Sequence, residues 1–149
     1  MAETEHDVFD LDRFVDAQDE SYDQALRELR SGRKESHWMW WIFPQYAGLG
    51  ISPTSQRFAI RSRAEAAAYL EHEALGARLM ECMNTLLEHH GRTAFEIMGS
   101  PDDLKLRSCV TLFASVLPED PVLSGVLKQY FDGQPDSRTL DLLSQEGSR

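Results

Sequence analysis

The sequence predicts an all-α protein, a compact single domain of seven to nine short helices. Residues typical of helix starts recur along the chain, namely Ser, Thr or Asp followed by Pro, or by Glu or Gln three positions later. Between these starts, apolar residues repeat every three or four positions, which is the helical period. The pair Asp132-Gly133 lacks alternating apolar flanks, so it fits a helix end better than a β-hairpin.

The first 32 residues are expected to hold two helices. Asp10 can cap a helix that runs to about Asp19. Ser21 and Gln24 form a capping-box pattern at the start of a second helix, which Gly32 would end. One face of that second helix is apolar and consists of Tyr22, Ala25, Leu26 and Leu29.

Three helix starts follow in the middle of the chain. Ser52-Pro53 places a capping residue before a proline, and Ser62 with Glu65 is a capping-box pattern. The clearest helix is expected from Glu73 to His89, before Gly91. Its apolar stripe consists of Leu75, Leu79, Cys82, Met83, Leu86 and Leu87.

The last third of the chain carries the same signals. Helices are expected to start at Thr93, Ser100-Pro101, Asp120-Pro121 and Asp136. The first three of these helices are expected to end at Gly99, Pro118 and Gly133. The helix after Pro101 has an apolar face made of Leu106, Cys109, Val110, Phe113, Val116 and Leu117.

Length and charge define the domain organisation. A chain of 149 residues is the size of one domain. Nine acidic residues and one basic residue lie in positions 1–24, for a net charge of 1 − 9 = −8, whereas the whole chain carries −10. We therefore expect an acidic disordered N-terminus over 1–8, one helical domain over 9–146 and a frayed C-terminus over 147–149.

Composition also excludes several classes of function. Net acidity argues against nucleic-acid binding, which needs clustered Lys and Arg. The N-terminus has no basic and apolar signal sequence, and the longest apolar run, 38–43, is too short to span a membrane. These features and the two cysteines, Cys82 and Cys109, predict a cytoplasmic protein with free, buried thiols.

The aromatic segment, residues 36–46, is the first candidate site. It holds all three tryptophans, Trp38, Trp40 and Trp41, which cannot all face one core. The segment is therefore either a buried aromatic cluster in part or a groove that stacks on a ligand ring. His37 is a candidate acid–base residue or a structural hydrogen bonder, and Gln45 would shape the rim. The run 37–43 is too short to distinguish a helix from a strand.

The second candidate is the segment 102–111, which is expected to be helical. Its core face leaves Ser108, Thr111 and, further along the helix, Ser115 on a small polar stripe, flanked by Lys105 and Arg107. The stripe packs against a neighbouring helix, faces water or binds an anion, for which the Arg107 guanidinium is suited. No metal-ligand spacing, Ser nucleophile elbow or phosphate loop is present, so we predict no metal site and no bound cofactor.

These two segments together resemble the bacterial family of unknown function numbered 1810. The similarity covers residues 36–53 and 99–113 most specifically, and runs from about Phe9 to Leu143. It implies a compact, mainly helical single domain and carries over no catalytic residues. Cys109-Val110 stands where the family pattern leads us to expect Ser-Met. The order of the motifs is also faintly similar to that of domains that process ADP-ribose conjugates.

Two functions from different classes follow. In the first, the protein binds or processes a nucleotide-like small molecule, of the ADP-ribose or NAD type, at an aromatic and basic cleft. His37 would act as acid or base there, and the binding residues would be Trp38, Trp41, Gln45, Lys105, Arg107 and Ser108. In the second, the protein is a non-catalytic interaction module that uses residues 37–46 as a partner groove. The first function requires the two segments to meet in space.

Overall fold

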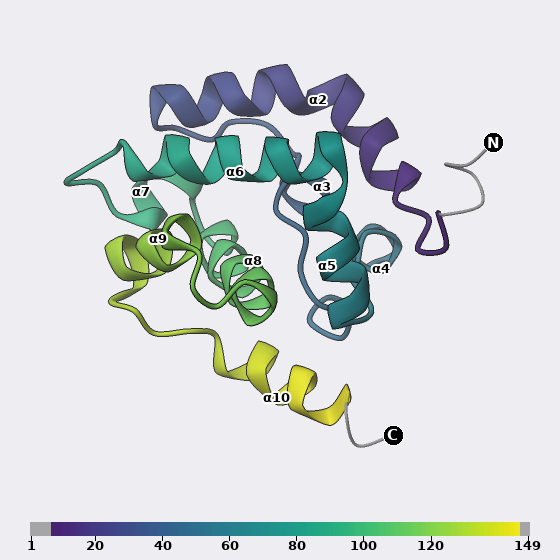
Figure 1. Ribbon diagram of the computed structural model, residues 1–149. Helices are drawn as coiled ribbons and strands as arrows, with labels where there is room; N and C mark the ends of the chain where they lie inside the picture. The colour runs from purple at the N-terminus through teal and green to yellow at the C-terminus, as the bar shows by residue number, and fades with distance from the viewer. Residues whose placement is uncertain (1–6, 147–149) are drawn as a thin grey trace.

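The computed structural model describes residues 7–146, and within them the chain forms nine helices without any β-strand. This result confirms the predicted all-α class (Figure 1). A single parallel bridge joins Tyr46 to Ile60. The helices are α2 (Asp12–Ser31), α3 (Met39–Ile42), α4 (Pro53–Arg57), α5 (Arg63–Glu71), α6 (Glu73–Leu87), α7 (Ala94–Met98), α8 (Asp102–Val116), α9 (Pro121–Phe131) and α10 (Ser137–Glu146).

Helix α8 lies at the centre of the packing. It contacts α5, α7, α9 and α10, while α6 lies between α2 on one side and α9 on the other (Figure 1). The core between them is aromatic as well as aliphatic. Tyr69 packs edge-on against Phe14 with a centroid distance of 5.2 Å, and it contacts Phe113 at the same distance. Aromatic pairs of this kind add to the stability that comes from apolar burial.

Most predicted helix starts are confirmed by their hydrogen bonds. Ser52 Oγ accepts from the Ser55 amide, and Thr93 with Glu96 forms a complete capping box. Asp120 accepts from the amides of Val122 and Leu123. These contacts satisfy amides that have no partner inside the helix. These helix starts could be predicted from the sequence, because each capping side chain bonds to an amide only two or three residues away.

The predicted break near residue 20 is wrong. Residues 12–31 form one helix that continues through Ser21, whose hydroxyl donates to the Ala17 carbonyl instead of capping an amide. Within a helix, a serine hydroxyl can donate to the carbonyl four residues earlier. The pattern Ser21–Gln24 is therefore compatible with a position inside a continuous helix as well as with a helix start. Gly32 ends the helix as predicted, in the left-handed conformation with φ 79°.

Near the candidate segments, the structure settles one open alternative and corrects one expectation. The run 37–43 holds a single helical turn, α3, and no extended strand. Its conformation is set by tertiary packing, because Met39 and Ile42 are both buried in the core. Pro101, not Ser100, is the residue before α8, and no side chain caps that helix start.

The expected disorder at 1–8 and fraying at 147–149 fall outside the described residues, except for Asp7 and Val8. Asp7 accepts a hydrogen bond from the Leu11 amide. In the range 7–146, none of the helices has the length and apolar character that crossing a membrane requires.

Candidate functional site

The two candidate segments meet at the start of α8. Asp102, in the first turn of α8, lies 2.8 Å from the Nζ of Lys34 and 3.2 Å from the Nζ of Lys105. Lys34 lies between α2 and the aromatic segment, so this ion pair joins parts of the chain about 70 residues apart. The Lys34 side chain is only 7% exposed, which places the contact inside the fold.

Each of these lysines also lies against a tryptophan ring. Lys34 Nζ is 4.8 Å from the centroid of Trp38, and Lys105 Nζ is 4.3 Å from that of Trp40. An ammonium group over an indole face is attracted by the negative potential of the ring. Because Asp102 pairs with both lysines, the two tryptophans and the start of α8 belong to one network.

Glu28 holds the chain that leads into the aromatic segment. Its carboxylate accepts from the amides of Glu35 and Ser36 at 2.8 and 3.0 Å, and from Trp38 Nε1 at 2.9 Å. The Ser36 hydroxyl also donates to it. Burial alone would raise the pKa of Glu28, but these hydrogen bonds together lower it to about 2. The ionised carboxylate therefore fixes the position of Trp38.

The three tryptophans have different environments, as expected from their adjacency. Trp38 is 1% exposed and belongs to the core. Trp41 is half-buried, donates from Nε1 to Ser21 Oγ at 2.7 Å, and packs against Phe58. Trp40 is half-buried and lines a pocket. Of the three rings, Trp40 is therefore the one that combines a pocket with a stacked cation.

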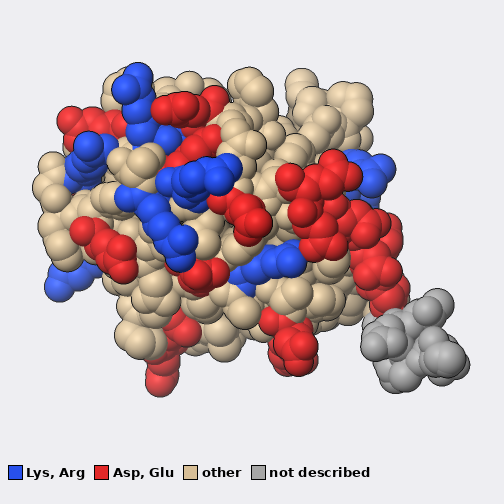
Figure 2. Space-filling view, turned by 90° about the horizontal axis from the view of Figure 1, so that it is seen from above, with Lys and Arg blue, Asp and Glu red and all other residues tan. Residues whose placement is uncertain are grey.

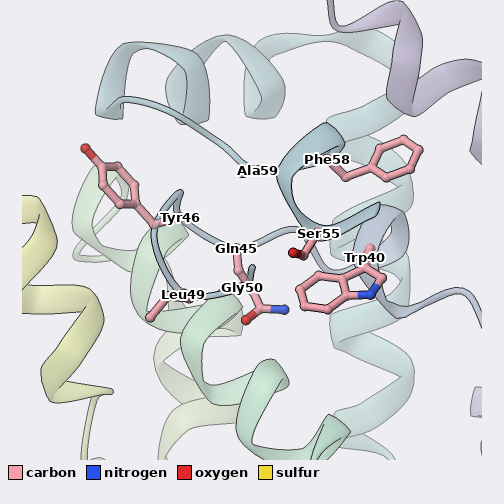
Figure 3. A pocket seen from close by; sticks show the side chains of 8 residues that line it. All are labelled: Trp40, Gln45, Tyr46, Leu49, Gly50, Ser55, Phe58 and Ala59. Atoms are coloured by element: carbon pink, nitrogen blue, oxygen red, sulfur yellow. The ribbon is translucent and has the colours of Figure 1, made fainter. Parts of the chain in front are cut away.

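The pocket beside Trp40 lies between the loop 45–50 and α4 (Figure 3). Its lining residues are Trp40, Gln45, Tyr46, Leu49, Gly50, Ser55, Phe58 and Ala59. The space open to the centre of a water molecule is about 10 Å³, which corresponds to one water. Gln45 is 6% exposed and forms part of the wall, not the rim that the sequence suggested.

The amide of Gln45 is incompletely bonded. Its Nε2 is buried and has no hydrogen-bond partner among residues 7–146. Figure 3 shows this nitrogen turned toward the Trp40 indole. A buried donor without an acceptor costs about 1–3 kcal/mol, so the position needs an explanation.

The other predicted site residues lie apart from this pocket lining. His37 is exposed. Arg107 donates from Nε to the Gln134 carbonyl at 2.8 Å and lies 6.0 Å from the Phe131 ring centroid, beside the end of α9. Ser108 is buried and donates to the Leu104 carbonyl. The structure thus brings Lys105 to the aromatic segment, but it directs Arg107 to α9.

The polar stripe of α8 packs inside the protein. Thr111 is 3% exposed, donates to the Arg107 carbonyl and accepts from the Asp136 amide at 2.8 Å. This is the packing alternative that the sequence left open. The two cysteines are buried as predicted, and burial raises the pKa of Cys82 to about 12. Both thiols are therefore protonated at neutral pH.

Three residues of the network were missed by sequence reasoning. Lys34 belongs to a basic stretch next to the end of a helix. Asp102 is an acidic residue in the first turn of a helix, where acidic residues are common, and the position of Glu28 within its helix has no special feature. In the sequence, each of these residues can be explained by helix stability alone. Only the contacts in the folded protein show that they belong to the network. Trp40 was considered only as one of three rings that could stack on a ligand, and the predicted binding residues included Trp38 and Trp41 instead of it.

The face that α2 forms offers little to an anion. Among the described residues of this face, Lys and Arg are interspersed with Asp and Glu and make no continuous basic area (Figure 2). Two of the basic residues of α2 and α6 are paired with carboxylates, Arg30 with Glu81 and Arg78 with Asp19. An anionic ligand therefore meets no broad basic area on the described part of this face.

Comparison with known proteins gives two matches and one negative result. Residues 8–143 match the model of a family described as a protein of unknown function, DUF1810. The crystal structure of the conserved hypothetical protein Rv1873 from Mycobacterium tuberculosis is similar to this one, with a TM-score of 0.89. The two sequences are 48% identical, and the match covers 91% of this chain and 97% of that one. No curated protein matches the chain. The family match covers most of the sequence, so the chain belongs to the DUF1810 family.

Proposed function

We propose that this protein binds a nucleotide-like small molecule, of the ADP-ribose or NAD type, beside Trp40 and Lys105. The observation that carries the proposal is the position of the Lys105 ammonium, 4.3 Å above the Trp40 ring and 3.2 Å from Asp102. An aromatic face and a cation at this separation suit a ligand that has a flat ring and a phosphate.

The ligand ring would take the place of the Lys105 ammonium on the face of Trp40. A cation over an accessible ring contributes only about 0.5–1 kcal/mol, so replacing the ammonium by the ligand ring would lose little free energy. The displaced ammonium stays on α8 near Asp102 and can meet the phosphate oxygens. Lys34 is held by Asp102 and Trp38, and it adds positive charge to the same area.

His37 remains the predicted acid–base residue, because it adjoins Trp38 in sequence and is exposed. Replacement of His37 by Ala is expected to leave binding intact and to abolish any turnover of the bound molecule. Arg107 remains a predicted phosphate contact, although its guanidinium donates to the Gln134 carbonyl. The Arg107→Gln variant tests that contact by its affinity for the same ligand.

The proposal is tested by thermal unfolding with ADP-ribose, NAD and AMP. At 100 times its Kd, a ligand that binds only the native state adds about 2.7 kcal/mol, or roughly 5–10 °C in Tm. Lys105→Gln and Trp40→Leu should lose this shift. Lys128→Gln is the matched control, because it removes an exposed lysine from α9. If none of the three compounds raises the Tm of the wild-type protein, the proposal is wrong.

A further inference from the structure

We infer that the bound molecule places an uncharged hydrogen-bond acceptor, an exocyclic carbonyl or carboxamide oxygen, against Nε2 of Gln45. This inference rests on the proposed function and specifies one chemical group of the ligand. It makes Gln45 the residue that selects among molecules able to stack on Trp40. The argument depends on the burial of this amide, on the shape of the pocket and on its position beside Trp40.

The first step is the unpaired donor itself. Gln45 is 6% exposed, and its Nε2 has no hydrogen-bond partner within the described part of the chain. The other buried polar side chains near this region are bonded. Ser55 donates to the Ser52 carbonyl at 2.8 Å, and Gln18 donates to the Trp41 carbonyl at 2.7 Å. An apolar residue at position 45 would avoid the cost of the unpaired donor. The retained amide therefore points to a partner that binds from outside.

The second step is the direction of the amide. Figure 3 shows the Gln45 side chain directed between Gly50 and the indole of Trp40, with its nitrogen nearer the indole. The backbone holds it there, because the Gln45 carbonyl accepts from the Ile60 amide at 2.9 Å. A ligand group that enters the pocket beside Trp40 therefore meets this donor.

The third step is the size of the opening. The pocket holds about one water-sized group, so a single oxygen fits and a whole ring does not. Gly50 helps to set this size. A Cβ at position 50 would lie 2.6 Å from Ser55 Oγ and 3.1 Å from Trp40 Cη2, so any side chain there would close the pocket or displace its walls.

Charge selects the class of acceptor. None of the residues that line this pocket carries a charge, and an amide donor pairs well with a neutral oxygen. A carboxylate or phosphate would lose its hydration without a cation inside the pocket. The phosphates of the ligand are thus expected outside, at Lys105, while a carbonyl-type oxygen enters.

The test compares Gln45→Met and Gln45→Glu with the wild type, using NAD, which carries the carboxamide oxygen of nicotinamide, and ADP-ribose, which has no such group. Gln45→Met removes the unpaired donor, so the Tm without ligand should rise by about 2–4 °C. Both variants should bind NAD at least tenfold more weakly and ADP-ribose almost as the wild type does, and Gly50→Ala should weaken NAD binding as well. Gln129→Met is the matched control on α9 and should bind like the wild type.

The outcomes separate this inference from the proposed function. If the wild type binds none of the compounds, both fall. If it binds ADP-ribose or AMP but not NAD, or if Gln45→Met binds NAD within twofold of the wild type, the inference is overturned and the proposed function stands. Gln45→Asn shortens the side chain while keeping the amide, so it serves if the Met variant does not fold. A tenfold loss in that variant supports the inference, and an unchanged Kd overturns it.

Discussion

Lys34 and Asp102 form an ion pair of 2.8 Å that joins the loop after α2 to the start of α8. Through it, the aromatic segment and the segment 102–111 share one network, as the nucleotide hypothesis requires. Asp102 also pairs with Lys105, so one carboxylate serves two lysines that each contact a tryptophan. This arrangement makes Asp102 the residue whose loss should affect both segments at once.

Replacement of Asp102 by Asn should reduce the free energy of unfolding by about 1.5–3 kcal/mol. The amide cannot balance two ammonium groups, and Lys34 is nearly buried. Urea unfolding at neutral pH measures the loss. The control is Glu81→Gln, because the Arg30–Glu81 pair is 62% and 48% exposed and should contribute less than about 0.5 kcal/mol. Equal effects of the two substitutions would show that the Asp102 network adds no special stability.

Glu28 should make stability depend on acid pH. Its pKa lies near 2 in the folded protein, below the ordinary value of 4.5, because hydrogen bonds from Ser36, Glu35 and Trp38 outweigh the effect of burial. The stabilisation is therefore complete above about pH 4.5 and is lost as the pH falls toward 2. Glu28→Gln should cost about 2–3 kcal/mol at pH 7, and the two proteins should converge near pH 2. A difference between them that stays constant from pH 7 to pH 2 would contradict this account.

Arg13 is expected to be the most sensitive cation in the fold. Its side chain is 6% exposed and donates to the carboxylate of Glu65 and to four backbone carbonyls, which belong to Phe9, Asp10, Arg57 and Ala59. Arg13→Met leaves Glu65 buried without its cation, at a cost of about 3–5 kcal/mol. Chemical denaturation should show this loss, and the double variant Arg13→Met with Glu65→Gln should recover part of it. A double variant less stable than Arg13→Met would contradict the ion-pair explanation.

Gly32 should resist substitution because of its backbone. It ends α2 at φ 79°, and a Cβ there would lie 2.6 Å from Nη1 of Arg92. Gly32→Ala should cost about 1–2 kcal/mol. Gly91→Ala is a useful comparison, because Gly91 also has a positive φ, of 86°, but its Cβ would meet nothing within 4 Å. If Gly32→Ala is no more costly than Gly91→Ala, the contact with Arg92 adds nothing to the backbone strain.

The sequence predicted the helices well where the signal is local. Ser52, Thr93 and Asp120 act on amides two or three residues away, so their roles are visible in the chain itself. The prediction failed at Ser21, where the same residue type bonds to a carbonyl inside a continuous helix. It also left residues 37–43 undecided, because packing determines that turn.

The candidate site was predictable only in part. The sequence identified both segments and included Lys105 and Gln45 among the binding residues. It could not show that Lys34 and Asp102 connect the segments, since their separation along the chain carries no periodic signal. Nor could it show that Lys105 faces Trp40 while Arg107 faces the end of α9, because that depends on how α8 is rotated in the core.

The most direct measurement of the central proposal is an NMR titration of the three indole N–H signals with ADP-ribose. The indoles of Trp38 and Trp41 donate inside the protein, to Glu28 and Ser21, and should move little. The Trp40 signal, assigned with a Trp40→Phe variant, should shift with ligand concentration and stay in place in Lys105→Gln. A Trp40 signal that does not respond while ADP-ribose binds elsewhere, or the absence of any binding by ADP-ribose, NAD and AMP, would contradict the proposal.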